Sequence, residues 1–324
     1  MNKTEILSLP DFSDLHIVVI GDVMIDRYIS GEVKRISPEA PVPIVEMDHR
    51  SDRLGGAANV AVNLHAFGAK VTLLSIIGED EGGKIIMQMS DAYEHISANL
   101  ITVHGRKTTV KTRIMSNTQH LLRIDHEDKA DINIETEDIL IVHLKQILNS
   151  STIHGIILQD YNKGLLTQGL IEQIMCLANS SDIPTFIDPK EKNFFTYKGC
   201  TVFKPNKKEI MSAINHSTED LNEIDQIVRQ NLSHELTIVT LGNEGLYMHD
   251  GRDGQNFSTS SRVIADVCGA GDTVISAITL GYLKNLPLSS LALLANTAGG
   301  QVCEKPGVVS VDLQELRAEL GEYP

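Results

Sequence analysis

Short apolar runs rich in valine and isoleucine recur along this 324-residue chain, with amphipathic stretches between most of them. Runs of this length that end at Gly, Asp or Asn are typical of buried parallel strands. The alternation predicts an α/β fold, a mostly parallel sheet flanked by helices on both faces. The predicted strands are residues 16–20, 71–77, 155–159, 184–187, 201–203 and 236–240. The predicted helices are residues 57–67, 136–148, 168–179, 206–214, 221–230, 272–284 and 288–302.

Two segments, 29–50 and 107–125, interrupt this alternation with short strand-like patterns that contain few large apolar residues. We expect them to project from the sheet as a small β lid that covers a site or pairs with a second copy of the chain. The first segment carries apolar residues outside the predicted core, at Val42, Ile44 and Met47. Because exposed strand edges are usually covered, this pattern predicts a homodimer that forms through the β extensions.

The charge and cysteine content exclude several classes of protein. The chain has 28 Lys and Arg against 43 Asp and Glu, a net charge of −15, which argues against nucleic-acid and anionic-membrane partners. No apolar run approaches the ~20 residues that span a bilayer, and the first residues do not resemble a signal peptide. We therefore expect a cytoplasmic protein. The four cysteines form no CxxC pair, so neither a disulfide framework nor a zinc site is expected.

One glycine-rich segment imitates a phosphate-binding loop. Residues 78–85, GEDEGGKI, nearly match the P-loop pattern GxxxxGK[ST]. However, Ile85 replaces the hydroxyl that would bind magnesium, and three acidic residues lie where polyphosphate would bind. We expect an ordinary strand-to-helix turn with an acidic helix start here.

A second glycine-rich segment, DVCGAGDT at residues 266–273, is a stronger candidate for an anion site. Its small residues Gly269, Ala270 and Gly271 allow close approach of the backbone, and an apolar helix follows. Backbone N–H groups at that helix start would face a transferring phosphoryl group. Asp272 in the first turn is a candidate general base, although a carboxylate there also serves as a helix-capping residue.

These features resemble the PfkB, or ribokinase-like, carbohydrate kinases. DVCGAGDT resembles the C-terminal signature DxxGAGD of that family. Three further segments resemble other signatures of the family: GGAANVAVNLHAFGA at 55–69, KPNKKE at 204–209 and TLGNEG at 240–245. All four segments occur along the chain in the order that the family shows. The resemblance implies a ribokinase-like fold, one kinase domain over residues 1–324, and a reaction that uses ATP and Mg²⁺.

The resemblance also implies roles for individual residues. Asp272 would be the base, and the amides of Gly269, Ala270 and Gly271 would stabilise the charge that develops on phosphate. The sugar would be bound by Asp26, Gly55, Gly56 and Asn59, with Asp22 as a weaker candidate that an Asx turn explains equally well. The nucleotide would be bound by Asn206, Lys207, Lys208, Glu209, Thr240, Gly242, Gly245 and Asn296, and Glu209 would position magnesium through water. Asn206 and Glu209 also fit a helix capping box.

Within the family, several runs are similar to heptose 7-phosphate kinases. They are RISPEAPVPIVE at 35–46, LGGAANVAVNL at 54–64, QHLLRID at 119–125 and DYNKGLLT at 160–167. This similarity implies transfer of phosphate from ATP to the anomeric hydroxyl of D-glycero-β-D-manno-heptose 7-phosphate. A sugar that already bears a phosphate needs cations, and the candidates are Lys111, Arg113, Arg123, Lys163 and Lys190, with Lys163 placed first.

Alternatives remain open from the sequence. The same chemistry could act on another sugar, such as fructose 1-phosphate or ribose. The cations discriminate between these cases, because a sugar without a phosphate, such as ribose, would leave Lys163 and Arg113 without a phosphate to bind. A non-catalytic sugar or nucleotide sensor would not need the base and the anion loop. An NAD-dependent enzyme would need GxGxxG after the first strand, where the chain reads GDVMID. No HxGH motif occurs, so an adenylyltransferase activity is not expected from this chain. The chain departs from the family signature at Cys268, where threonine is usual.

Overall fold

A computed structural model of the chain describes residues 7–116, 119–214 and 218–321. Within them, the larger of two sheets has strand order β13-β12-β11-β10-β9-β8-β1-β4-β5, and only the β11-β12-β13 pairings are antiparallel. Its strands are β1 (His16–Gly21), β4 (Lys70–Gly78), β5 (Ile96–Val103), β8 (Gly155–Gln159), β9 (Thr185–Asp188), β10 (Val202–Phe203), β11 (Leu236–Thr240), β12 (Leu246–His249) and β13 (Gly254–Phe257). The predicted mostly parallel sheet is confirmed.

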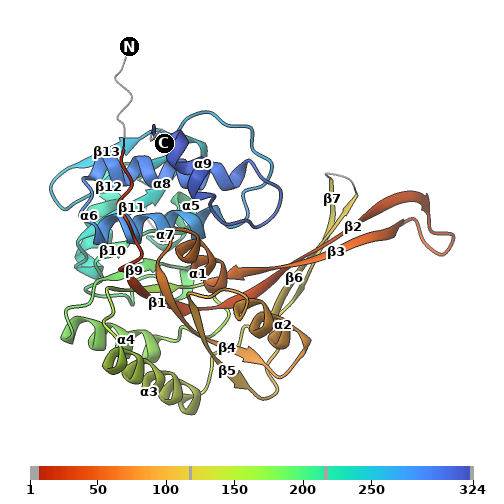
Figure 1. The fold of residues 1–324 in the computed structure, drawn as a ribbon, viewed down its shortest axis with the longest axis horizontal. Helices are drawn as coiled ribbons and strands as arrows, with labels where there is room; N and C mark the ends of the chain where they lie inside the picture. The colour runs from red at the N-terminus through yellow and green to blue at the C-terminus, as the bar shows by residue number, and fades with distance from the viewer. Residues whose placement is uncertain (1–6, 117–118, 215–217, 322–324) are drawn as a thin grey trace.

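Helices cover both faces of this sheet (Figure 1). One face packs against α1 (Ala57–Ala66), α7 (Ala270–Leu283), α8 (Leu288–Cys303) and α9 (Leu313–Glu319). The other packs against α3 (Ile134–Ser150), α4 (Gln168–Ser180), α5 (Lys207–Ala213) and α6 (Leu221–Leu232). Strand β1 shows why the runs are apolar throughout, because Ile17 and Val19 enter the first core while Val18 and Ile20 enter the second. No helix in the described ranges is long and apolar enough to cross a membrane.

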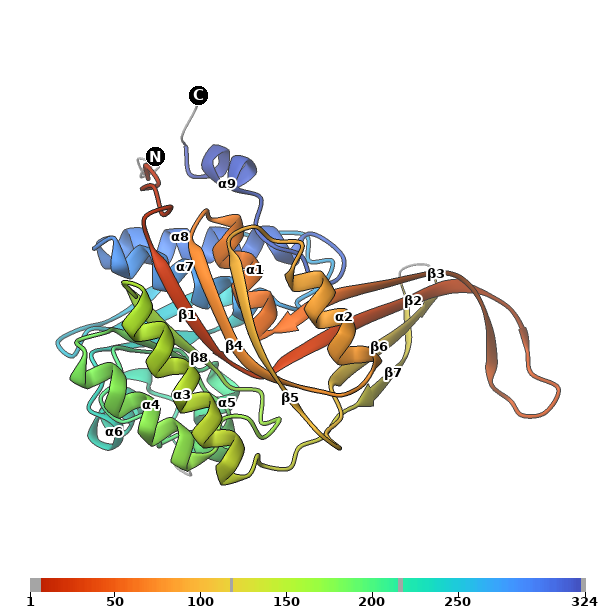
Figure 2. The same cartoon turned by 60° about the horizontal axis from the view of Figure 1, so that its bottom comes forward.

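The second sheet, which we call the β lid, projects from one side of the molecule in both views (Figures 1 and 2). Its strands, in the order β3-β2-β6-β7, are β2 (Val23–Ile36), β3 (Pro43–Gly56), β6 (Thr109–Ser116) and β7 (Gln119–His126). The predicted β extensions are therefore confirmed, except that residues 117–118 lie outside the described part. Our boundaries were too short at the base of the lid, since β2 begins at Val23 and β3 continues to Gly56. Asp26 accordingly lies within β2 and not in a loop after β1.

The segment 78–85 is the strand-to-helix turn that the sequence predicted. Asp80 caps α2 (Glu81–Ser90), and its carboxylate accepts a hydrogen bond of 2.8 Å from the N–H of Gly83. Asp80 therefore serves the helix start, whereas Glu79 pairs with His104. Two short 3-10 turns complete the described elements, η1 (Glu191–Asn193) and η2 (Gly242–Glu244).

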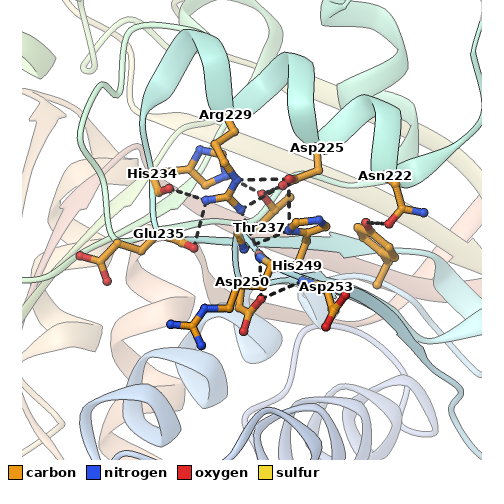
Figure 3. A network of polar contacts seen from close by, with 12 residues as sticks. Asn222, Asp225, Arg229, His234, Glu235, Thr237, His249, Asp250 and Asp253 are labelled. Atoms are coloured by element: carbon orange, nitrogen blue, oxygen red, sulfur yellow. Dashed lines mark hydrogen bonds and ion pairs between the residues drawn. The ribbon is translucent and has the colours of Figure 1, made fainter.

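A buried polar network joins α6 to strands β11 and β12 (Figure 3). At its centre, the carboxylate of Asp225 is 1% exposed and contacts Arg229, the hydroxyl of Thr237 and the ring of His249. Arg229 also donates to the carbonyl oxygens of His234, Glu235 and His249. Because β11 and β12 flank the turn at 240–245, this network supports the segment that the sequence assigns to nucleotide binding.

We predict that Arg229→Met destabilises the protein by about 3 kcal/mol, because it leaves the Asp225 carboxylate buried without its cation. The change is measured as the free energy of unfolding in urea. The control is Arg252→Met on the exposed loop before β13, which should change stability by less than about 0.5 kcal/mol. Equal stability of the two variants would contradict a supporting role for the network.

Candidate active site

The carboxylate of Asp272 lies in the first turn of α7 and is 2% exposed. Three side chains from other segments hold it. Asn59 on α1 donates to Oδ2 at 2.8 Å. The other oxygen, Oδ1, accepts from Gln159 Nε2 at 3.1 Å and from the Tyr161 hydroxyl at 2.8 Å. Gln159 ends β8, so this carboxylate lies at the carboxyl edge of the parallel sheet, where ligands bind in such folds.

Burial raises the pKa of Asp272 to about 7. The hydrogen bonds from Asn59 and Tyr161 oppose this rise because they favour the charged form. Among charged neighbours, Asp188 raises the pKa and Lys204 lowers it. A carboxylate with a pKa near neutrality suits a general base, since it is ionised at working pH and still accepts a proton readily.

The GAGD segment (residues 269–272) forms the start of α7, and its backbone conformation requires glycine at position 269. Gly269 has φ +81°, and a Cβ there would lie 2.7 Å from Nδ2 of Asn59. The first N–H groups of a helix have no partner within the helix. Here the N–H of Ala270 donates to the carbonyl oxygen of Val267 at 3.3 Å, so the other first N–H groups are the donors that this turn offers to an anion beside Asp272. We call this turn the anion cradle, and it lies next to the buried Asp272 carboxylate.

A buried ion pair that we had not assigned to the site lies beside this cradle. Lys204 Nζ is 3.1 Å from Asp188 Oδ1, and both side chains are buried. A Cβ on Gly271 would lie 3.9 Å from each of them. The same edge also holds Gln159 and Tyr161. Each of these four residues ends a predicted strand or follows it closely, which is the sequence signal that could have identified them.

The residues predicted to bind sugar gather at the base of the β lid. Asp26 on β2 is paired with Arg113 on β6, and a Cβ on Gly55 would lie only 2.1 Å from Asp26 Oδ2. Gly56 has φ +59° and precedes α1, which carries Asn59. The structure thus brings Asp26, Gly55, Gly56 and Asn59 together.

Arg113 also links the β lid to the GAGD segment. Its guanidinium lies 3.4 Å from the Sγ of Cys268 and 5.3 Å from the ring centre of Tyr28. Burial raises the pKa of the Cys268 thiol to about 11, so this cysteine is a neutral thiol at physiological pH.

The other predicted phosphate-binding cations are not all together. Lys111 and Lys190 lie 5.4 and 5.5 Å from the ring centre of Tyr161. Lys163 pairs with Glu127 at 2.7 Å, and Arg123 pairs with Asp125 on the exposed surface of β7. The structure therefore places Lys111 and Lys190, and not Arg123, at the aromatic ring that contacts Asp272.

The residues predicted to bind nucleotide form two adjacent turns. Asn206 caps α5 in a capping box with Glu209, as the sequence predicted. Asn206 pairs with Thr240 in a parallel bridge, which brings the turn with Gly242 and Gly245 alongside. The glycines have φ +64° and +95°, values that disfavour other residues.

The remaining predicted nucleotide residues lie at the periphery of these turns. Lys207 and Lys208 are exposed, and Lys207 pairs with Glu219 at 3.3 Å. Asn296 on α8 donates to the carbonyl oxygen of Phe257 at 3.0 Å, so its amide supports the chain that follows β13.

Magnesium prefers carboxylate, phosphate and water oxygens. The described part of the chain contains no group of three or more His, Cys, Asp or Glu side chains that could hold a metal ion. Glu209 accepts from the N–H of Asn206 through Oε2 at 2.8 Å and contacts Lys190 through Oε1. Because both oxygens have partners, Glu209 fits a contact to magnesium through water better than direct coordination.

Comparison with known proteins identifies the family. Residues 14–315 match the pfkB family carbohydrate kinases. The chain belongs to this family. It is therefore an ATP-dependent carbohydrate kinase.

Curated relatives extend along almost the whole chain. It is 37% identical over 310 residues to the bifunctional protein HldE of Methylobacillus flagellatus, covering 94% of this chain and 63% of the relative. It is 36% identical over 317 residues to the bifunctional protein HldE of Desulfatibacillum aliphaticivorans, covering 97% and 64%. The chain thus spans slightly less than two thirds of the length of these relatives.

Solved structures show the fold. Phosphofructokinase-2 from Escherichia coli in complex with substrates and products has a TM-score of 0.78 at 17% identity, covering 95% of this chain and 99% of that one. A putative phosphofructokinase from Staphylococcus aureus has a TM-score of 0.72 at 16% identity, covering 94% and 96%. The predicted ribokinase-like fold is confirmed.

We predict an acid limb in the pH profile of kcat/KM for the acceptor, with an apparent pKa of about 7. Activity requires the ionised form of the base, so kcat/KM should fall about tenfold per pH unit below the limb and level off above it. The measurement is the initial rate of ADP release at a series of sugar phosphate concentrations between pH 5.5 and 9. A profile that stays flat down to pH 5.5 would contradict Asp272 as a base with a raised pKa.

Proposed function

We propose that the chain transfers the γ-phosphoryl group of ATP to the anomeric hydroxyl of D-glycero-β-D-manno-heptose 7-phosphate, giving the 1,7-bisphosphate for lipopolysaccharide core synthesis. The observation that carries this proposal is the buried Asp272 carboxylate at the anion cradle, within reach of lysines at Tyr161. The HldE relatives and the heptose-kinase runs of the sequence support the choice of sugar. Because its donor is ATP, we place the reaction in the cytoplasm.

In this mechanism Asp272 removes the proton of the anomeric hydroxyl as that oxygen attacks the γ-phosphorus. The bond between the γ-phosphorus and the bridging oxygen breaks, and ADP leaves. The amides of Gly269, Ala270 and Gly271 stabilise the charge on the transferring group. Lys204, buried beside Gly271, balances the charge of Asp188 on the same side, so that this carboxylate does not repel the phosphoryl group.

The acceptor would lie between the β lid and the first turn of α7. Asp26 would accept hydrogen bonds from sugar hydroxyls, and Asn59 would donate to them. Gly55 and Gly56 have no side chain that would keep the sugar away from the backbone. The phosphate on the sugar would interact with Lys111 and Lys190. Lys163 remains a candidate once its ion pair with Glu127 opens.

The nucleotide would occupy the turns at 206–209 and 240–245. Lys207 and Lys208 would be available to its phosphates, and Asn296 would lie near its adenine ring. Magnesium would bind the phosphates of ATP, with Glu209 contacting its water shell. When bound, the ion neutralises phosphate charge. On this proposal residues 1–324 act as one kinase domain, and the β lid covers the acceptor.

The test is ADP release from Mg-ATP with heptose 7-phosphate, fructose 1-phosphate, fructose 6-phosphate, ribose or no sugar. We expect turnover that is selective for heptose 7-phosphate. Selective turnover of another sugar would keep the mechanism and reject the heptose assignment. Silence on every sugar with intact ATP binding would favour a sensor.

Asp272→Asn provides the matched negative variant in this assay. It should lose turnover and keep ATP binding, because the amide preserves shape and cannot accept the proton. Asp253→Asn, on the loop before β13, should behave as the wild type. An active Asp272→Asn protein would refute the mechanism.

We also propose that the chain forms a homodimer through the face of the β lid that points away from Arg113. Ile29, Ile114 and Leu122 lie side by side on three neighbouring strands, and Ile124 follows on the same face. Leu122 and Ile124 are 56% and 49% exposed, and Met47 is 63% exposed on the outer strand β3. An apolar face of this kind usually packs against a partner.

We predict that Leu122→Lys converts the dimer to a monomer, because it places a charge on this apolar face, on the edge strand β7. Light scattering at micromolar concentration measures the mass of both proteins. Ile134→Lys, at a 74% exposed position at the start of α3, is the control and should stay dimeric. A monomeric wild-type protein would contradict the proposal.

A further inference from the structure

Tyr161 connects the base to the acceptor side of the site, and no role was assigned to it above. Its hydroxyl donates to Asp272 Oδ1 at 2.8 Å. Its ring centre lies 5.4 Å from Lys111 Nζ on β6 and 5.5 Å from Lys190 Nζ after β9. One side chain therefore contacts the base, a lysine of the β lid and a lysine of the main sheet.

The loop that carries Tyr161 is held firmly in place. The carboxylate of Asp22 accepts the backbone N–H groups of Tyr161, Lys163 and Leu165 at 2.9, 3.0 and 3.3 Å. Asn162, between them, has φ +52°, an uncommon value for a residue with a side chain. A strained position that is fixed by buried hydrogen bonds is a common feature of functional loops.

The chemistry of the contact gives it a direction. Burial and the nearby Asp272 carboxylate raise the pKa of Tyr161 well above its usual value, so the phenol keeps its proton. A phenol that donates to a carboxylate favours the ionised, proton-accepting form of that carboxylate. Ammonium groups near the face of the ring gain cation–π attraction, which restricts where they lie.

We propose that Tyr161 is a positioning residue that keeps Asp272 ionised through its hydroxyl and fixes Lys111 and Lys190 through its ring. The inference rests on the proposed role of Asp272 as the base. It assigns the hydroxyl to the proton transfer and the ring to the binding of an anionic acceptor, and these two functions are separable by mutation.

Several other groups face Asp272 and must be held constant in the test. They are Asn59 on α1, Gln159 at the end of β8, Asp188 at the end of β9, Lys190 after it, and Lys204 after β10. Tyr161→Phe leaves all of them in place and removes one hydroxyl. We expect the acid limb of kcat/KM to move up by about one pH unit, so that kcat/KM at pH 6.5 falls about eightfold through kcat, while KM for the acceptor stays within twofold.

Tyr161→Leu removes the ring as well. We expect the same displacement of the acid limb and, in addition, a several-fold rise in KM for the phosphorylated acceptor, because Lys111 and Lys190 lose the surface that fixes them. If Tyr161→Leu raises KM no more than Tyr161→Phe, the assignment of the ring is wrong.

Tyr197→Phe is the matched control. Tyr197 donates its hydroxyl to Asp160 at 2.8 Å, a buried phenol–carboxylate contact beside the same loop that does not involve Asp272. This variant should leave the limb in place. A limb that moves equally in both variants would reflect loosening of the loop and would overturn the proposal, as would an unchanged limb in Tyr161→Phe.

A second measurement does not depend on the sugar. The carboxyl carbon of Asp272, in protein labelled with ¹³C-aspartate and assigned by its absence in Asp272→Asn, is titrated by NMR without substrate. We expect a higher pKa in Tyr161→Phe than in wild type. If no sugar is turned over but this shift appears, the proposed function fails and the positioning role stands; no shift overturns the positioning role.

Discussion

Asp22 holds together the parts of the molecule that form the site. Its carboxylate accepts three backbone amides of the loop that follows β8, and its carbonyl oxygen accepts the N–H of Ala57 at the start of α1 at 3.0 Å. The loop carries Tyr161 and the helix carries Asn59, and both donate to Asp272. Burial raises the pKa of Asp22 and the backbone bonds lower it. A buried acceptor between the two sheets thus orients two of the three donors on the base.

Two carboxylates of the site are paired with cations, although the chain as a whole is strongly negative. Asp26 and Asp188 are each matched by one cation, Arg113 and Lys204, so that these two buried carboxylates are neutralised. The β lid contributes to this arrangement from one face, through Arg113 and Lys111, and exposes apolar side chains such as Leu122 and Ile124 on the opposite face. Alternation of side chains along its strands separates the two faces.

Most of the main sheet could be predicted because its central strands are buried on both faces and are mostly apolar. The elements that escaped prediction have weaker patterns. Strand β5 lies at an edge and is only partly buried, so ISANLITV mixes polar and apolar residues without a clear period. The hairpin β12–β13 has four-residue strands, and α9 is a single short helix of seven residues. Such elements depend on tertiary packing more than on their own sequence.

The sequence by itself determined the features that depend on neighbours along the chain: the order of the central strands and the main helices, the glycine-rich start of α7, the capping box of Asn206 with Glu209, and the two glycine turns. Only the tertiary structure decided which side chains meet at Asp272. Gln159, Tyr161 and Asn59 are more than 100 residues away from it in sequence. Their convergence follows from the order of parallel strands, and the pairings of Arg113 and Lys163 follow from how the β lid packs. Local patterns specify backbone conformation over a few residues, whereas these contacts depend on which distant elements share an edge.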